Sequence, residues 1–476
     1  MDAASKVLSA VLSPVLARAC GTADAAGSAL AAVPAPRYVV YPETDRFVEA
    51  FGSKQLLQAM RQRSAAAAAT ALAVNVHIPF RASRCNPCSG RTMAVGRDSH
   101  GADYLKLLAH EIELASAALG PTARVDMLHL VSRSPTVLTD DELAQLLALL
   151  QARLRLEPGA DRTIDADSRT IDVERLHGLH RIGFNHINFG IVDLDPVMRG
   201  AGRLVHDVLQ VRRLVQAAAA LGFRSSRVDL VCGLPRQTVA SFRRALALTI
   251  DLAPHRIAVH VLDHPTQRYR AHGRVDARAF PHAGTGRAML DAATTDLVAL
   301  GYRHIGMELF ALPEDQLAVA RRQGRLQRGP QGFTTHPGGI LGLGVSALSR
   351  FGATYSQNAL ALGDYRERLA QQQLPVVRGL ALSRDDLLRR SVIMGLLCQG
   401  RVDFEAIAIA HLQDPRVALC AELSQAAKLA QRGLLRLTES AIELTTQGLR
   451  CAATVAATFD RYRMSDARRE RNSHVT

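Results

Sequence analysis

Cys85 and Cys88 form a CxxC pair in a short polar segment, RASRCNPCSG, that follows an apolar run. Two thiolates at this spacing can ligate a metal ion or cycle between dithiol and disulfide. A structural zinc site needs four ligands, and the sequence has no second pair. The spacing alone therefore leaves a metal site, a redox pair and a loop without chemistry open. The other five cysteines are scattered, which is typical of a reducing compartment, at positions 20, 232, 398, 420 and 451.

Histidines and carboxylates near the ends of apolar runs are further candidates. His255, His260 and His264, with Asp263 beside the last, lack a fixed metal-ligand spacing, so a metal site is not favoured there. Asp229 precedes a Gly-Leu-Pro turn, where it can cap the turn or accept a hydrogen bond from a ribose hydroxyl.

Short apolar runs alternate with helix-period segments from about residue 72, a pattern typical of βα units with a parallel sheet. Six strands are expected, at 72–80, 125–131, 163–167, 186–192, 227–233 and 256–262, and the clearest helices at 103–119, 140–154, 205–221 and 238–252. Ligands of such folds bind beyond the carboxyl ends of the strands. Periodicity does not distinguish a flat doubly wound sheet from a partial barrel.

Helices dominate after about residue 380, and residues 433–448 read as a hairpin, GLLRLTESAIELTTQG. This combination predicts a winged-helix-like module. Because no helix there concentrates Lys and Arg, DNA binding is not favoured.

Residues 74–90 read VNVHIPFRASRCNPCSG and resemble the cluster loop of the oxygen-independent coproporphyrinogen III oxidases of the radical SAM superfamily. In that family a strand ending in VHIPF runs into CxxxCxxC, with a further cysteine two residues later. Cys85 and Cys88 stand at the second and third cysteine positions, Arg81 at the first and Gly90 at the extra one.

Landmarks from residue 36 to about residue 465 carry the same resemblance in order and spacing. They include Arg37-Tyr38 with Tyr41-Pro42, Gly183-Phe184-Asn185, Asp229 with Gly233-Leu234-Pro235, Gly306-Met307, Gln331-Gly332 and residues 342–349. Family membership therefore rests on most of the chain.

The resemblance implies an α/β fold: a radical-SAM-type partial (β/α) barrel with an N-terminal extension and a helical, winged-helix-like C-terminal domain. The expected division is a flexible Ala-rich leader (1–35), the extension (36–70), the barrel (71–375) and the C-terminal domain (376–476). The family's activity is oxidative decarboxylation of coproporphyrinogen III, in which a 4Fe-4S cluster and S-adenosylmethionine (SAM) generate a radical. The expected partner is a tetrapyrrole with carboxylate side chains, coproporphyrinogen III or heme.

Most of the positions that the family motif assigns to these cofactors depart from the family pattern. Arg81 replaces a cluster ligand, and a guanidinium offers no lone pair to iron. SAM-contacting positions are, by the motif, Asn75 for a tyrosine, Ser132, Arg133 and Ser134 in place of a glycine-rich stretch, Asp165 for a glutamate, Val192 for a glutamine, and Arg203 and Asp229 unchanged in type. The scaffold landmarks survive while the strand ends have changed.

Composition adds little to this assignment. The charge is +14, with 58 Lys+Arg against 44 Asp+Glu, and this suits polyanions such as carboxylated tetrapyrroles, membranes or nucleic acids. No apolar run is long enough to span a membrane. A cytoplasmic monomer is expected.

Three functions remain open from the sequence. The first is a diverged family member of heme and porphyrin biosynthesis with impaired radical chemistry. The second is an active coproporphyrinogen III dehydrogenase with a non-standard cluster ligand, and the third is a heme-binding or heme-transfer protein.

Overall fold

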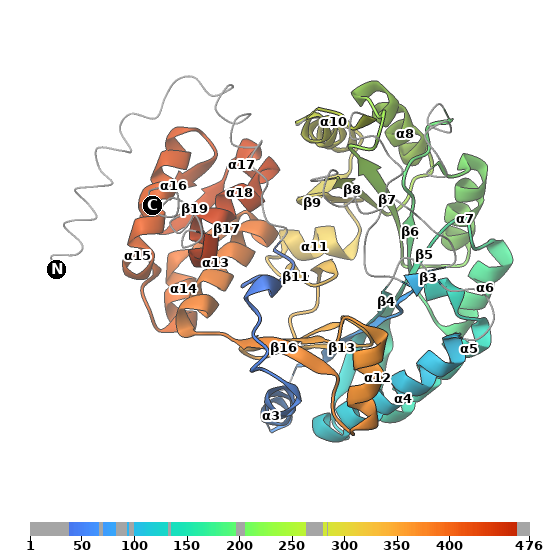
Figure 1. The fold of residues 1–476 in the computed structure, drawn as a ribbon. Coiled ribbons are helices and arrows are strands. Elements are labelled where there is room, and N and C mark those ends of the chain that lie inside the picture. The colour runs from blue at the N-terminus through green and yellow to red at the C-terminus, as the bar shows by residue number, and fades with distance from the viewer. Residues whose placement is uncertain are drawn as a thin grey trace.

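The computed structural model describes residues 38–65, 70–81, 93–94, 100–131, 135–196, 205–262, 279–282 and 284–463. Its main feature is a twelve-stranded sheet in the order β16-β15-β14-β13-β1-β4-β5-β6-β7-β8-β10-β9 (Figure 1). The central parallel strands are β1 (Leu72–His77), β4 (Arg124–Val131), β5 (Arg155–Ala166), β6 (His186–Gly190), β7 (Ser225–Cys232) and β8 (Arg256–Val261).

These six strands follow one another in space as they do along the chain. Every crossover therefore advances in the same direction, and right-handed crossovers then place the helices on one face. A doubly wound sheet would reverse its order at a switch point. The predicted partial barrel is confirmed.

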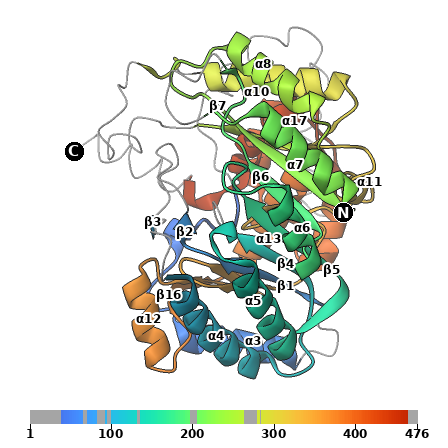
Figure 2. The ribbon, with the colours of Figure 1, turned by 90° about the vertical axis from the view of Figure 1, so that its right-hand side faces the viewer.

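Helices cover the outer face of the sheet (Figure 2), and several of them begin at residues that cap a helix N-terminus. Thr139 and Glu142 form a capping box for α5, and the Asp172 side chain accepts from the Arg175 N–H of α6. The helices are α4 (His100–Leu119), α5 (Asp140–Arg153), α6 (Val173–Ile182), α7 (Val208–Ala220), α8 (Val239–Asp251) and α10 (Thr285–Ala299).

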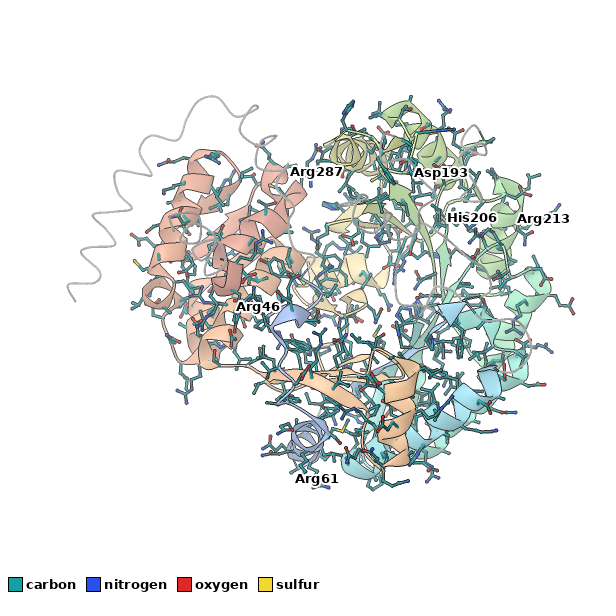
Figure 3. The ribbon with its side chains drawn as sticks, in the orientation of Figure 1. Arg46, Arg61, Asp193, His206, Arg213 and Arg287 are labelled. Carbon is teal, nitrogen blue, oxygen red and sulfur yellow. The ribbon has the colours of Figure 1, made fainter. Side chains whose placement is uncertain are left out.

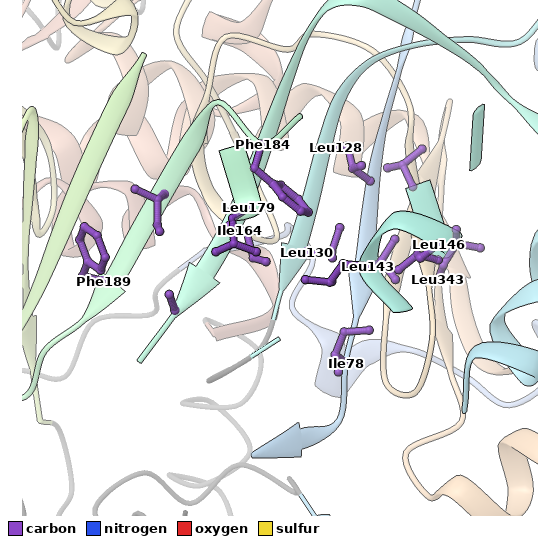
Figure 4. Packing of buried hydrophobic residues seen from close by; sticks show 14 of the residues in the cluster. Ile78, Leu128, Leu130, Leu143, Leu146, Ile164, Leu179, Phe184, Phe189 and Leu343 are labelled. Atoms are coloured by element: carbon purple, nitrogen blue, oxygen red, sulfur yellow. The ribbon is translucent and has the colours of Figure 1, made fainter. Parts of the chain in front are cut away.

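Buried aliphatic and aromatic side chains join the sheet to these helices (Figure 4). Leu128, Leu130 and Ile164 project from β4 and β5, while Leu143 and Leu179 project from α5 and α6. All five side chains are fully buried. The apolar runs that predict strands in the sequence thus form the side of this core that belongs to the sheet.

Short strands extend the sheet at both edges, and the βα alternation did not predict them. Beyond β1 lie β13 (Ile340–Leu343), which is parallel to it, and the antiparallel β14 (Leu348–Phe351), β15 (Thr354–Asn358) and β16 (Val376–Ala381). Beyond β8 lie β10 (Leu309–Ala311) and β9 (Arg303–Gly306). The remaining short elements are η2 (Pro135–Val137), α12 (Leu362–Ala370), and the two-residue pair β2 (Phe80–Arg81) and β3 (Met93–Ala94).

The concave side of the sheet holds α11 (Gln316–Arg322) and the hairpin β11 (Gln327–Gly329) and β12 (Gly332–Thr334). In Figure 1 they lie between the sheet and the C-terminal helices. They narrow the lumen of the partial barrel.

The C-terminal part has a separate apolar core and a three-stranded sheet in the order β17-β19-β18. The predicted hairpin is confirmed as β18 (Leu435–Leu437) and β19 (Ala441–Leu444), while β17 (Arg401–Asp403) was not foreseen. The accompanying helices are α13 (Arg384–Gln399), α14 (Phe404–His411), α15 (Pro415–Ala418), α16 (Cys420–Gln431), α17 (Thr446–Arg450), α18 (Ala452–Ala456) and η5 (Ala457–Phe459).

The N-terminal extension and α10 connect this part to the barrel. The extension contains η1 (Thr44–Arg46) and α3 (Ser53–Ser64), and the Tyr38 hydroxyl donates to Asp460 Oδ2 at 3.0 Å. Arg287, on the side of α10 that faces the C-terminal helices (Figure 3), donates to the Arg450 carbonyl. Within the described ranges, every helix is too short or too polar to cross a bilayer.

Candidate functional site

The lumen of the partial barrel is lined by polar side chains from adjacent strands. Asn75 pairs in register with His129, Asp165 with Asn188, and Asn188 with Arg227. Residues paired in register on neighbouring parallel strands project from the same face of a sheet. The register therefore gathers side chains that are far apart in sequence.

Asp165 forms the first cluster. It accepts from Asn188 Nδ2 at 2.7 Å and contacts His129 Nε2 at 2.8 Å, and the histidine and asparagine side chains are buried. Burial disfavours the carboxylate, but His129, Arg227 and the Asn188 hydrogen bond outweigh it and lower the pKa of Asp165 below its usual value. Asp165 is therefore ionised and already has protein partners.

Asp229 forms the second cluster. Arg227 Nε and Nη2 donate to its two carboxylate oxygens at 2.6 and 3.0 Å. His260 Nε2 lies 3.6 Å from Asp229 Oδ2, and His260 Nδ1 lies 3.7 Å from Glu308 Oε1. Despite the opposing effect of burial, Arg227 and His260 hold the pKa of Asp229 well below its usual value. A bidentate arginine pair of this kind is strong and directional.

His260 carries a positive charge at neutral pH. Burial favours the neutral ring, but Asp229 and Glu308 outweigh it and raise the pKa of His260 to about 9. This raised pKa contributes stability that is fully present below a pH of about 6.5 and is lost as the pH rises through about 9.

Glu308→Gln is expected to lower the pKa of His260 by about one unit, because one of the two facing carboxylates is removed. The pKa is measured by NMR titration of the histidine ring. The matched control is Glu439→Gln in the C-terminal part, which should leave the His260 titration unchanged. An unchanged His260 pKa in Glu308→Gln would mean that Asp229 alone holds the imidazolium.

The structure brings three of the sequence-predicted site residues into the lumen and leaves others undescribed. Asp165 belongs to the first cluster and Asp229 to the second. Asn75 borders the first cluster through its register partner His129. Val192 is buried after β6, with its backbone carbonyl accepting from the Val231 N–H at 3.1 Å. Outside the described residues lie Cys85, Cys88, Ser132, Arg133, Ser134 and Arg203, together with the side chain of Arg81.

Sequence reasoning missed His129, Asn188, Arg227 and Glu308. His129 and Arg227 are each two residues from another lumen residue on the same strand, Met127 and Asp229 respectively. Period-two alternation was therefore a usable signal for them. Glu308 had none, because it reaches His260 through the antiparallel pairing of β10 with β8.

The carboxyl end of β1 is anchored where the chain enters the segment containing Cys85 and Cys88. His77 Nδ1 lies 2.8 Å from the Val345 carbonyl oxygen, and the His77 carbonyl accepts from the Tyr104 hydroxyl at 2.7 Å. Burial lowers the pKa of His77 below its ordinary value. His77 thus holds the end of β1 in place through its contacts with Val345 and Tyr104.

Of the three histidines that the sequence places close together, His255, His260 and His264, the structure describes the first two, and these lie in different places. His255 contacts Ser226, with its Nδ1 3.1 Å from the Ser226 Oγ, while His260 lies in the lumen. No group of three potential metal ligands occurs within the described residues. His264 and Asp263 lie outside them.

Comparisons with known proteins agree with this geometry. A family model described as the HemN C-terminal domain matches residues 382–451. An oxygen-independent coproporphyrinogen III oxidase of Pseudomonas aeruginosa is 36% identical over 443 residues, covering 92% of this chain and 96% of the relative. The Escherichia coli protein of that name is 34% identical over 445 residues, covering 92% and 95%.

A solved structure gives the same result in three dimensions. The structure of coproporphyrinogen III oxidase (HemN) from Escherichia coli, described as a radical SAM enzyme, superposes with a TM-score of 0.85 and 31% identity. The match covers 90% of this chain and 97% of the other.

Proposed function

Because this chain belongs to the family of oxygen-independent coproporphyrinogen III oxidases, we propose that it is a diverged member of heme and porphyrin biosynthesis with impaired radical SAM chemistry. Homology over more than nine-tenths of the chain supports the biosynthetic assignment. The observation that carries the impairment is Arg81, which stands at the first cluster-cysteine position.

Family membership implies a 4Fe-4S cluster, and the donor set of this chain does not fit it. A radical SAM cluster takes three thiolates from the protein, whereas Cys85 and Cys88 supply two. Arginine is always protonated and has no lone pair to offer. Iron coordination would have to be completed by a ligand outside this motif.

The described part of the SAM site also fits its cofactor poorly. SAM is a cation, and the motif assigns Asp165 and Asp229 to contact it. Asp229 is held bidentately by Arg227, and Asp165 is engaged by His129 and Asn188. These internal partners use part of the acceptor capacity that a cationic ligand would need, so weaker SAM binding is expected. Asn75 Oδ1 is a buried acceptor with no partner among the described residues.

A tetrapyrrole with carboxylate side chains remains the proposed partner, bound by a cytoplasmic monomer. An Arg-rich chain with 58 basic residues suits a ligand with several carboxylates.

Anaerobic reconstitution with iron and sulfide tests the proposal. We expect the wild-type chain to hold well under four irons and to lack the EPR signal of a reduced 4Fe-4S cluster. Arg81→Cys should raise iron incorporation severalfold, because it supplies the third thiolate. Arg81→Ser is the matched control, since it removes the guanidinium without adding a thiolate. Near-stoichiometric cluster in the wild-type chain would overturn the impairment.

The extent of homology favours one alternative, an active coproporphyrinogen III dehydrogenase with a non-standard cluster ligand. It requires about four irons per chain and formation of 5′-deoxyadenosine from SAM under reducing conditions. The reconstitution experiment distinguishes the two functions.

A further inference from the structure

A cavity of about 60 Å³ lies in the lumen between the central strands and the β11–β12 hairpin. Its polar lining includes Asn75, His129, Asn188, Arg227, Arg256 and Gln331, and none of its lining residues is acidic. Asp165 and Asp229 are therefore outside its wall, although they bind residues that line it. Two guanidinium groups and several other hydrogen-bonding groups lie in the wall beside apolar side chains such as Met127, Phe333 and Ile340.

Arg227 and Arg256 place two guanidinium groups in the same wall. They are register partners on β7 and β8, and both line the cavity. Arg227 is paired with Asp229, and Arg256 Nε donates to Asp315 Oδ2 at 2.7 Å. Each arginine thus has one carboxylate partner that fixes its position, which leaves other guanidinium nitrogens for a second acceptor.

Two side-chain atoms of lining residues lack partners, whereas His336 Nδ1, from a third lining residue, lies 2.7 Å from Asp126 Oδ1. Arg256 Nη2 is a buried donor, and Asn75 Oδ1, on β1, is a buried acceptor; neither has a hydrogen-bond partner within the part of the chain that the structure describes. Buried polar atoms are almost always hydrogen-bonded in folded proteins. An acceptor inside the cavity would complete the hydrogen bonding of Arg256.

The size of the cavity limits what that acceptor can be. One water needs about 10 to 15 Å³ of such cavity volume, so about 60 Å³ has room for about four to six atoms of water size. A CH₂–COO⁻ group has four non-hydrogen atoms. Its two oxygens match the fork of an arginine.

We propose that this cavity binds the carboxylate end of a propionate-sized group, with Arg256 Nη2 and Arg227 on its wall as donors. The inference rests on the proposed function in one respect, because a tetrapyrrole of heme and porphyrin biosynthesis would supply the propionate side chain. A free monocarboxylate has the same chemistry. The donor set is independent of any iron cluster.

Titration with sodium propionate tests the cavity. Binding is measured by calorimetry and by the shift in thermal unfolding, with sodium chloride at the same ionic strength as the reference. Wild-type protein should bind propionate saturably. Arg256→Lys keeps a cation beside Asp315 but has no counterpart of Arg256 Nη2. It should therefore weaken propionate binding at least tenfold. Arg244→Lys is the matched control, because Arg244 pairs with Asp195 at 2.8 Å on α8 and does not line the cavity. Ala73→Val, which narrows the cavity without changing charge, should weaken binding in the same way.

A second titration, with coproporphyrin III and the Soret band as the signal, identifies the source of the carboxylate. Competition between coproporphyrin III and propionate supports a tetrapyrrole arm in the cavity. Propionate binding without competition supports a free small carboxylate. Absence of saturable propionate binding, or equal affinity in Arg256→Lys and wild type, overturns the proposal and leaves the cavity to water. Iron counting is a separate measurement, so failure here does not bear on the cluster.

Discussion

Replacement of Glu111 by alanine is expected to destabilise the protein by about 3 to 5 kcal/mol. The Glu111 carboxylate is 2% exposed and accepts from Gly344 N at 2.7 Å, Asn358 Nδ2 at 2.6 Å and the Tyr365 hydroxyl at 2.5 Å. Alanine leaves these three buried donors without their acceptor. The loss is measured by urea unfolding followed by far-UV circular dichroism.

Glu111→Gln is the matched variant, and it makes the prediction pH-dependent. Burial outweighs the three donors and raises the pKa of Glu111 to about 7, against an unfolded value near 4.5. The stability from this raised pKa is fully present below about pH 4.5 and is lost as the pH rises through about 7. Glutamine does not ionise, so the wild-type chain should lose stability relative to Glu111→Gln across this interval.

The same contacts connect Glu111 to the candidate site. Gly344 has φ +93°, and a Cβ there would lie 2.4 Å from the His77 carbonyl oxygen. Glu111 thus holds the turn after β13 against the end of β1. A loss below about 1 kcal/mol in Glu111→Ala, the size of one ordinary hydrogen bond, would show that this joint is held by its other contacts.

Breaking the buried Arg389–Glu422 pair is expected to destabilise the C-terminal part by about 3 to 5 kcal/mol. Arg389 Nη1 donates to Glu422 Oε1 at 2.8 Å and to the Phe459 carbonyl at 3.1 Å, and the two charged side chains are 9% and 8% exposed. Arg389→Met leaves the Glu422 carboxylate buried without its cation. Hydrogen exchange of the α13 and α16 amides measures the loss.

Two controls isolate the cause. Arg416→Met breaks an exposed pair with Asp414 and should change stability by less than about 1 kcal/mol. Adding Glu422→Leu to Arg389→Met removes the unpaired charge and should recover much of the stability. If the double variant is as unstable as the single one, the Arg389 bonds to Asp385 and to the Phe459 carbonyl are the larger contribution.

The partial barrel was predictable because βα alternation extends over many residues and the family landmarks cover most of the chain. The strands β9, β10 and β14–β16 were not, since they have three to six residues each and their neighbours are set by pairing rather than by periodicity. Long β5 was predicted only from residue 163, because Pro158 and Gly159 weaken the strand pattern before it.

What the sequence by itself determined is the chemistry of single residues. Arg81 cannot ligate iron in any fold, because the guanidinium has no lone pair. Asp165 and Asp229 lie within the predicted strands 163–167 and 227–233, so their place in the sheet was readable as well. These conclusions depend on local pattern and functional-group chemistry, which folding does not alter.

Only the tertiary structure decided the partners of those residues. Register between β6 and β7 brings Arg227 beside Asn188, and antiparallel pairing of β10 with β8 brings Glu308 to His260. The unpartnered atoms of Asn75 and Arg256 come from strands almost two hundred residues apart, and share one cavity because the sheet curves. Charge neutralisation and cavity shape depend on distances across the lumen, and no local pattern in a sequence encodes those distances.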